Sequence, residues 1–217
     1  MSKRIAVLVS GNGSNLERLI ELSRAGFIDG EISLVISSNE KAFALERAKR
    51  HSIPSRILHF NSRSCDAYSD VILQTIVDCE IDLIVLAGFL KILSGKIIER
   101  FRNRIINLHP SLIPSFCGKG MYGERLHRAV IESGVRITGA TVHFVDGGTD
   151  TGPIILQEAV PVLCDDTAES LSGRVALVEH RLLPKAVSLF CKDRLTVRGK
   201  RVLITGGSYE NSVVERL

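Results

Sequence analysis

Asn107 and His109 stand two residues apart in the stretch RIINLHPSLIPSF (residues 104–116), and Pro110 follows at once. If the apolar run before them is a strand, both side chains point to the same face, because side chains alternate along a strand. An amide donor beside an imidazole can stabilise an oxyanion as it forms, and the imidazole can also move a proton. The pair therefore indicates either group-transfer chemistry or, as is commoner for a lone histidine, a structural role at a strand end.

A glycine-rich stretch, VHFVDGGTDTGPIILQ (residues 142–157), adds carboxylates to this pair. Asp146 and Asp150 lie between two alternating apolar segments, and the neighbouring glycines allow tight backbone turns. An acid that reaches His109 would favour the charged imidazole. The alternative interpretation is a solvated β-turn without a role in catalysis. His143 could line the same site, although a buried structural histidine is the simpler interpretation.

A second polar loop, SGNGSNL (residues 10–16), lies between an apolar run and a helical pattern. Free backbone N–H groups and the helix dipole favour an anion at such a position, so Ser14 and Asn15 are candidates for a phosphate site. The loop lacks the third glycine of the dinucleotide fingerprint and the Gly-Lys-Ser/Thr ending of a P-loop. These differences favour a phosphate monoester over NAD or ATP. A plain glycine-rich connection with a Ser/Asn cap is the alternative.

A regular framework must position these loops, and the first part of the chain alternates strand and helix patterns. Apolar, β-branched runs predict strands at 4–10, 31–39, 55–60, 81–89 and 104–109. Helical spacing predicts helices at 15–26, 42–52, 65–79 and 94–101. This order predicts an α/β fold with a doubly wound, mostly parallel sheet and right-handed crossovers. Ligands bind at the carboxyl ends of strands in such sheets, which is where SGNGSN, GFLKILS and NLHPSLIP fall.

The last third of the chain has a different pattern. ITGATVHFV and GPIILQEAVPV predict an antiparallel pair of strands in the C-terminal part. Residues 167–190 predict a long helix that packs back on the sheet, and Pro184 should break or bend it because proline lacks a backbone N–H. Residues 192–217 resemble a small hairpin with a polar tail. No repeat or linker interrupts the chain, so we expect a single domain over residues 1–217.

Composition narrows the class of protein. The chain has 217 residues, of which 45% are hydrophobic and 24% charged, as is ordinary for a soluble globular protein. Its net charge of +4 suits small anionic substrates better than a nucleic-acid groove. The five cysteines are widely spaced without a C-x-x-C pair, so neither a disulfide framework nor a metal site is indicated. No signal pattern or membrane-length apolar run is present, which favours the cytoplasm and excludes a membrane partner.

Several blocks, in order and at the right distances, resemble the glycinamide ribonucleotide formyltransferase family, a folate-dependent family of purine biosynthesis. They are VLVSGNGSNL, DLIVLAGFLKILS, INLHPSLIPSF, TGATVHFVDGGTDTGPIILQEAVPV and RVALVEHRLLP, and together they cover nearly the whole chain. The resemblance implies formyl transfer from 10-formyltetrahydrofolate to the primary amine of glycinamide ribonucleotide, without a metal or a covalent enzyme intermediate. It also implies small-molecule partners, no nucleic acid, and a monomer or homodimer.

The resemblance further implies roles for single residues. Asn107, His109 and Asp150 match the family's catalytic trio. Asn107 and charged His109 would stabilise the tetrahedral oxyanion, and Asp150 would hold His109 charged and help to move the proton to the leaving folate nitrogen. The residues expected to bind glycinamide ribonucleotide are Gly13, Ser14, Asn15 and Glu179. Those expected to bind the folate are Arg63, Leu90, Lys91, Ile92, Leu93, Asn107, Asp146, Gly147, Gly148, Thr149 and Asp150.

Two positions depart from relatives in that family. Some relatives have arginine at the position of Lys91, and others support the phosphate with a glutamine at the position of Ala176. Alanine cannot do so, and phosphate binding must therefore depend on the glycine loop or on a basic group such as Lys119 or Arg125. The basic, glycine-rich stretch at residues 115–130 is a hypothetical mobile flap over the phosphate.

Other functions must be weighed. A formyltetrahydrofolate hydrolase shares the trio and passes the formyl group to water, but carries an N-terminal regulatory domain, for which a first strand at residue 4 is expected to leave no room. Methionyl-tRNA formyltransferase shares the core but adds a C-terminal RNA-binding domain, which we do not expect here. A dehydrogenase or a non-catalytic phosphate- or nucleotide-binding module would explain the glycine loop, but not the trio.

Overall fold

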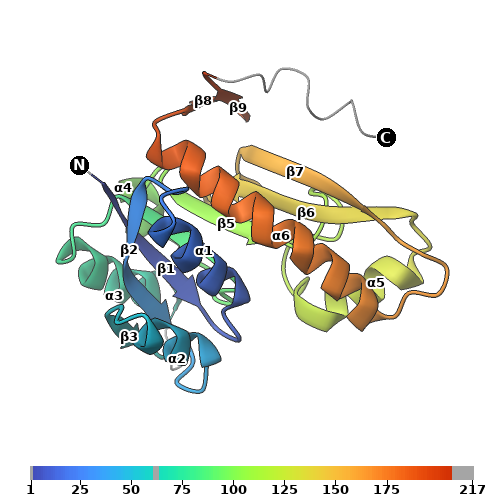
Figure 1. The fold of residues 1–217 in the computed structure, drawn as a ribbon, viewed down its shortest axis with the longest axis horizontal. Helices are drawn as coiled ribbons and strands as arrows, with labels where there is room; N and C mark the ends of the chain where they lie inside the picture. Colours follow the sequence, from blue (N-terminus) through green and yellow to red (C-terminus); the bar gives the residue numbers. More distant parts are fainter. Residues whose placement is uncertain (1, 61–63, 207–217) are drawn as a thin grey trace.

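The computed structural model describes residues 2–60 and 64–206. A nine-stranded sheet runs through the molecule in the order β3-β2-β1-β4-β5-β6-β7-β9-β8. Helices pack along it, and the longest of them, α6, follows the strands of the C-terminal part (Figure 1). The predicted α/β architecture is therefore confirmed.

The first five strands are parallel and form the doubly wound part of the sheet. They are β1 (Lys3–Val9), β2 (Gly30–Ser37), β3 (Ser55–Ile57), β4 (Leu83–Leu86) and β5 (Ile105–His109). The helices between them are α1 (Ser14–Arg24), α2 (Phe43–Arg50), α3 (Cys65–Val77) and α4 (Lys96–Arg100). The chain winds outward from β1 to β3 and then restarts at β4 on the other side of β1. This reversal opens a crevice at the carboxyl ends of β1 and β4, where a ligand is expected.

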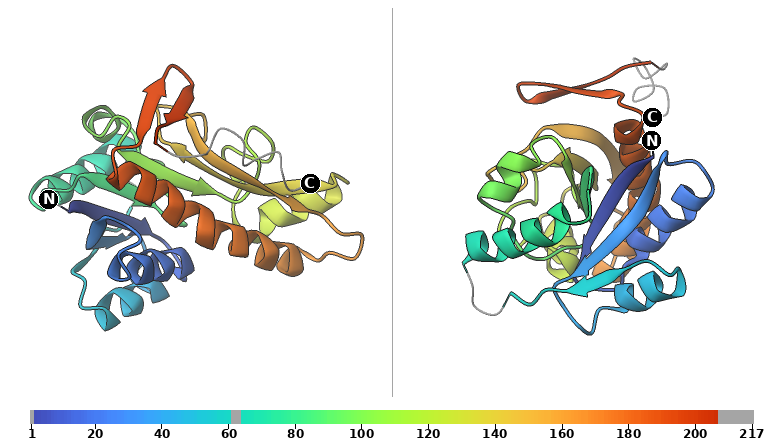
Figure 2. Two further views of the ribbon diagram at one scale, coloured as in Figure 1. Left: turned by 45° about the horizontal axis from the view of Figure 1, so that its top comes forward. Right: turned by 90° about the vertical axis from the view of Figure 1, so that its left-hand side faces the viewer.

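The direction of pairing changes at β5. After α5 (Gly123–Glu132), β6 (Ile137–Phe144) runs antiparallel to β5, and β7 (Ile154–Pro161) runs antiparallel to β6. This confirms the predicted antiparallel pair. The chain continues through α6 (Ala168–Cys191) into a hairpin of β8 (Leu195–Arg198) and β9 (Arg201–Ile204), which projects beyond the end of α6 (Figure 2).

The long helix α6 passes through Pro184 as one element, so the predicted break does not occur. Pro184 and its neighbours Leu182, Leu183 and Val187 are all buried. Burial of large apolar side chains stabilises a protein by about 1.5–3 kcal/mol each, which offsets the backbone hydrogen bond that proline cannot make. Within the described part of the chain, no helix combines the length and apolar character needed to cross a lipid bilayer.

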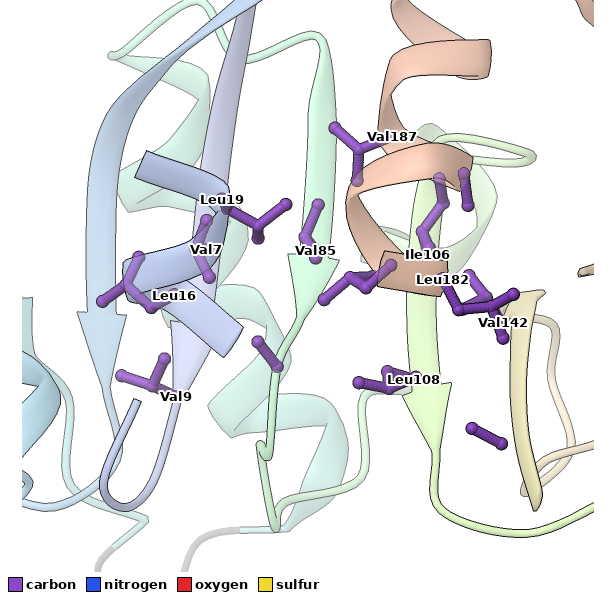
Figure 3. Packing of buried hydrophobic residues seen from close by; sticks show 14 of the residues in the cluster. Val7, Val9, Leu16, Leu19, Val85, Ile106, Leu108, Val142, Leu182 and Val187 are labelled. Carbon is purple, nitrogen blue, oxygen red and sulfur yellow. The ribbon is translucent and has the colours of Figure 1, made fainter. Parts of the chain in front are cut away.

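The hydrophobic core forms one layer on each face of the sheet. One layer lies under α1, α2, α5 and α6 and includes Val7, Ile106 and Leu108 from the strands (Figure 3). The other lies under α3 and α4 and includes Ile105. Since residues alternate along β5, Ile106 and Leu108 face α6, whereas Ile105, Asn107 and His109 face the opposite side. The core packing thus decides the direction of the two polar side chains.

Candidate active site

Strands β5 and β6 place four polar side chains side by side. In the antiparallel ladder Asn107 lies opposite His143, and His109 lies opposite Thr141. Directly opposed residues project from the same face of a sheet. All four side chains therefore lie on the face turned away from α6, and three of them, His109, Thr141 and His143, are buried.

The loop after β6 carries Asp150 to this group. One carboxylate oxygen, Oδ2, lies 3.8 Å from Nδ1 of His109, and the other, Oδ1, lies 3.7 Å from Nε2 of His143. The backbone N–H of Gly118 donates to Oδ2 at 2.9 Å. Burial acts to raise the pKa of Asp150, but the contacts with His143 and Gly118 and the charge of His109 outweigh it, and the pKa lies below its ordinary value. Asp150 is therefore a carboxylate at neutral pH.

Both ring nitrogens of His109 face acceptors. Nε2 lies 2.9 Å from the carbonyl oxygen of Phe116, to which it must donate, and Nδ1 faces the carboxylate of Asp150. The 3.8 Å between Nδ1 and the Asp150 carboxylate is an ion-pair distance and too long for a direct hydrogen bond. The ring of His109 is thus fixed at Nε2 and turns Nδ1 toward the carboxylate of Asp150.

Asn107 is oriented by His143. Its Nδ2 lies 3.1 Å from Nε2 of His143 and 3.4 Å from Oδ1 of Asp150. Nδ1 of His143 donates to the carbonyl oxygen of Phe144 at 2.8 Å, which fixes the ring with Nε2 toward the other two residues. In the neutral ring Nε2 accepts from Asn107, while Oδ1 of Asp150 lies 3.7 Å from the same nitrogen, beyond hydrogen-bond distance. His143 is thus buried in β6, as the structural interpretation of its sequence position predicts, and it also contacts Asn107 and Asp150.

Asp146 organises the loop that holds Asp150. Its Oδ1 accepts from the N–H of Gly148 at 3.1 Å and from the hydroxyl of Thr151 at 2.6 Å, and Nζ of Lys200 lies 3.3 Å from Oδ2. Burial acts to raise the pKa of Asp146, but these hydrogen bonds outweigh it and the pKa is lowered. The carboxylate of Asp146, a predicted folate ligand, is therefore engaged within the loop itself.

Two backbone constraints turn Asp150 inward. A Cβ on Gly152 would lie 1.8 Å from the carbonyl oxygen of Phe144, so only glycine fits there. Asp150 itself has a φ of +56°, in the left-handed region that aspartate and asparagine tolerate better than most residues. The predicted folate residues Gly147, Gly148 and Thr149 are exposed at the rim of this turn.

The loop after β4 presents a partly apolar surface. Leu90 and Ile92 are large hydrophobic residues that are 53% and 45% exposed. Such exposed apolar side chains are compatible with the predicted role of this loop in binding the folate ring. Lys91 places Nζ 5.2 Å from the centre of the Phe60 ring, a cation–π contact. Leu93, in contrast, is buried in the core layer beside α3 and α4. Of the predicted folate residues here, Leu90 and Ile92 are therefore the exposed ones.

The proposed phosphate loop lies at the carboxyl end of β1. Gly13 immediately precedes α1 with a φ of +76°, and a Cβ there would lie 2.6 Å from Cβ of Ala44. Ser14 is the first residue of α1 and is exposed. The free N–H groups of the first turn of α1 are thus open to an anion.

Asn15 and Glu179 connect α1 with α6. Nδ2 of Asn15 donates to Oε2 of Glu179 at 2.9 Å, while Oδ1 of Asn15 is buried without a partner among the described residues. Burial raises the pKa of Glu179, against the opposing effects of Asn15 and the charge of His109. The Asn15–Glu179 hydrogen bond thus joins the start of α1, beside the candidate phosphate loop, to the middle of α6.

Comparison with known proteins identifies the family. Residues 3–187 match the family described as formyl transferase. The chain belongs to the formyl transferase family. The phosphoribosylglycinamide formyltransferase of Haemophilus influenzae is 36% identical over 211 residues, which are 97% of both chains. The chloroplastic enzyme of that name from Vigna unguiculata is 39% identical over 90% of this chain, which spans 63% of that relative. The crystal structure of glycinamide ribonucleotide transformylase 1 from Symbiobacterium toebii is 41% identical, with a TM-score of 0.89 over 94% of each chain.

These relatives confirm the resemblance that the sequence blocks indicate. In this formyl transferase the matched segment runs from β1 into α6 and includes the trio and Glu179, whereas the hairpin of β8 and β9 lies beyond it. Arg63, the predicted partner of the folate glutamate, lies outside the described residues.

The basic residues proposed for the flap of this formyl transferase lie in the segment from the end of β5 to the first turn of α5. Lys119 and Arg125 are exposed, and neither makes a hydrogen bond or ion pair in the described part of the chain. The second half of residues 115–130 is helix α5, which buries Leu126 and Val130 in the core, so a mobile flap would be confined to residues 115–122. All five cysteines are free.

Proposed function

We propose that this formyl transferase moves the formyl group of 10-formyltetrahydrofolate to the primary amine of glycinamide ribonucleotide, in purine biosynthesis. The observation that carries the proposal is the convergence of Asn107, His109 and Asp150, with 3.8 Å between the imidazole of His109 and the carboxylate of Asp150. The names of the relatives support the choice of acceptor.

In the proposed reaction the amine nitrogen attacks the formyl carbon. A new C–N bond forms, the carbonyl oxygen becomes an oxyanion, and the bond from carbon to the folate nitrogen then breaks. Asn107 and charged His109 donate hydrogen bonds to the oxyanion, each in exchange for one of its present partners, such as the carbonyl of Phe116 for His109. A hydrogen-bond donor to a developing oxyanion typically contributes about 10²–10³-fold in rate.

The proton lost by the attacking amine must reach the leaving folate nitrogen. Asp150, ionised and partly exposed between the two histidines, is the group placed to accept it and return it, directly or through water. A proton transfer of this kind typically contributes about 10²–10⁴-fold. Asp150 thereby acts as the general base and acid while its charge holds His109 in the charged form.

The substrates would lie in a row along the crevice. The phosphate of glycinamide ribonucleotide fits at Gly13, Ser14 and Asn15, and Glu179 would orient the amine. The folate ring would lie between the exposed apolar side chains after β4 and the rim of the turn at residues 147–149. The formyl group of the folate would then face the amine of the ribonucleotide, beside Asn107, His109 and Asp150. A cytoplasmic location and a monomeric or homodimeric state remain predictions.

The main competing function is hydrolysis of the formyl folate, because the same trio could activate water. The presence of a phosphate loop and of Glu179 favours an amine-bearing phosphate ester as the acceptor. A non-catalytic phosphate-binding module or a dehydrogenase would not explain why Asn107, His109 and Asp150 lie together.

The deciding experiment measures the release of tetrahydrofolate from 10-formyltetrahydrofolate by purified protein, with and without glycinamide ribonucleotide. We expect release only when the ribonucleotide is present, with formylated ribonucleotide formed in equal amount. Release at the same rate in water alone would make the protein a hydrolase and remove the acceptor roles of Ser14, Asn15 and Glu179. No release under either condition would contradict the proposal as a whole.

A further inference from the structure

The loop that precedes α1 is held from the side by an arginine of α2. Nε of Arg47 donates to the carbonyl oxygen of Asn12 at 3.0 Å, and Nη2 donates to Oδ1 of the same residue at 3.1 Å. Its third nitrogen, Nη1, donates to Oε2 of Glu17, in the first turn of α1, at 3.0 Å. One guanidinium thus ties the residue before Gly13 to the helix that follows it.

The backbone of α2 reinforces this contact. The N–H of Ala44 donates to the carbonyl oxygen of Gly11 at 3.2 Å. A Cβ placed on Gly13 would lie 2.6 Å from Cβ of Ala44 and 3.5 Å from Cδ of Arg47, so the loop packs directly against this helix. Gly11 and Asn12 are therefore held by hydrogen bonds from α2, and Gly13 cannot shift toward that helix because it packs against Ala44.

Arg47 is itself fixed by a carboxylate with two partners. Oε2 of Glu17 accepts from Arg47, and Oε1 lies 2.6 Å from Nε2 of His51, the residue that follows α2. The side chains of Arg47 and His51 are 20% exposed and that of Glu17 is 25% exposed. The pKa of Glu17 is lowered, mainly by the hydrogen bond from His51 and further by Arg47, despite partial burial. An ionised Glu17 in this position favours one rotamer of Arg47 among the many available to it.

We propose that Arg47, held by Glu17 and His51, is a positioning residue that keeps the loop at Gly13–Asn15 in the conformation that binds the phosphate of the acceptor. The inference rests on the phosphate site of the proposed function. It adds the contacts of Arg47 that hold the loop of this site in place. Ala176 cannot donate a hydrogen bond to a phosphate, so the orientation of the loop N–H groups decides the affinity. A loop ordered in advance loses less conformational entropy when the anion binds.

Helix α2 offers a matched control. Arg50 places its guanidinium 5.4 Å from the centre of the Phe43 ring, and Arg47 lies 5.0 Å from the same ring. Arg50 is exposed and makes no hydrogen bond among the described residues. Arg50→Ala therefore removes the same charge and the same ring contact from the same helix, but leaves the loop as it is.

The test compares Arg47→Ala with Arg50→Ala. For each we would measure kcat, the KM for glycinamide ribonucleotide, the Kd for the folate, and the Kd for ribose 5-phosphate by calorimetry. We expect Arg47→Ala to raise the KM and the ribose 5-phosphate Kd about tenfold, the effect of losing hydrogen bonds to a charged group. The kcat and the folate Kd should stay unchanged, Arg47→Lys should recover part of the loss, and Arg50→Ala should resemble the wild type.

Several results would overturn the inference. One is an Arg47→Ala protein that binds ribose 5-phosphate as tightly as Arg50→Ala does. Another is an equal loss toward glycinamide riboside, which lacks the phosphate. If Arg47→Ala does not fold, Glu17→Gln, which keeps the side-chain size, should weaken ribose 5-phosphate binding about threefold, and unchanged binding would count against us.

The calorimetric measurement also separates this inference from the proposed function. The protein could bind ribose 5-phosphate tightly, in a way that depends on Arg47, and yet transfer no formyl group. This result would contradict the proposed function and leave the inference about Arg47 intact. Failure of the wild type to bind ribose 5-phosphate would overturn the inference.

Discussion

Asp150 is the residue whose replacement should separate catalysis from binding most clearly. Asp150→Asn keeps an oxygen that can accept from the N–H of Gly118, at present 2.9 Å away, and therefore preserves the turn. It removes the charge beside His109 and the proton acceptor. We expect kcat to fall about 10³-fold, within the range for general acid–base catalysis, with the KM of both substrates changed less than about threefold. Steady-state kinetics and the far-ultraviolet circular dichroism of the variant check this, and a parallel loss of folate affinity would mean that Asp150 mainly shapes the pocket.

His143 should act through Asn107. His143→Ala removes the ring nitrogen that lies 3.1 Å from the Asn107 amide and leaves that amide with only its longer, 3.4 Å hydrogen bond to Asp150. We expect kcat to fall about tenfold with little change in KM, as for loss of one orienting hydrogen bond. His143→Gln, whose amide can pair with Asn107, should recover part of the rate. If the alanine and glutamine variants lose the same activity, and only in proportion to their lower thermal stability, His143 is structural.

Single residues differ in how far the sequence alone could identify them. Asn107 and His109 can be predicted from their spacing at the end of an apolar run, and Asp150 can be predicted from its place in a glycine-rich turn. His143 is ambiguous because a histidine inside a strand is usually structural. Arg47 gives no signal at all: with Lys49 and Arg50 it forms the basic last turn of a short helix, which normally faces solvent. Only the tertiary contact between α2 and the loop distinguishes it.

At the scale of elements, the start of α6 depends on a charged cap. Thr167 caps the helix with Ser170, and Asp166 accepts from the N–H of Leu163 at 2.8 Å, from the hydroxyl of Ser170 at 2.7 Å and from the guanidinium of Arg174. The Arg174 hydrogen bond lowers the pKa of Asp166 well below its ordinary value of 3.8. Since α6 carries Glu179, this cap also supports the helix that is proposed to contact the acceptor.

We expect Asp166→Asn to lower the free energy of unfolding at pH 7 by about 2 kcal/mol, as for charged hydrogen bonds in a buried position. Because the pKa is lower in the folded state, the contribution is complete above the ordinary value of 3.8 and is lost as the pH falls below it. Urea unfolding of both proteins from pH 7 to pH 3 should therefore show a difference that shrinks with acidity. A difference that is constant with pH would mean that the charge of Asp166 is not its source.

The helices and strands were largely predictable, because each type of element has a characteristic pattern of apolar residues. Continuous apolar runs indicate the buried parallel strands, and helical spacing indicates the helices around them. The course of α6 through Pro184 was not predictable from local sequence. Packing of the buried residues around the proline decides it, and these come from several distant elements.

At the scale of the whole molecule, both core layers share one sheet, and we expect residues 1–217 to unfold in a single transition. The chain has no tryptophan, and Tyr68 is fully buried in the layer under α3 and α4, where burial raises its pKa to about 12. The near-ultraviolet signal of Tyr68, assigned with Tyr68→Phe, should therefore change at the same urea concentration as the far-ultraviolet helix signal. Separate midpoints would mean that the two layers unfold independently.

The topology of the molecule follows from the order of its elements more than from any single residue. Alternation of strands and helices up to α5, followed by the two consecutive strands β6 and β7, leaves few arrangements that obey short, right-handed connections. The position of the hairpin of β8 and β9 could not be inferred in this way, because β9 meets β7 at a single pair of residues, Ile154 and Arg201.

The change from parallel to antiparallel pairing at β5 also divides the chemistry along the chain. Asn107, His109 and the phosphate loop precede the connection at residues 133–136, and Asp150 and Glu179 follow it. A polypeptide cut at that connection would yield two fragments, each with half of a site. Formyl transfer by the mixed fragments would then require β5 of one fragment to pair with β6 of the other. The activity would therefore measure how much of the sheet had reassembled.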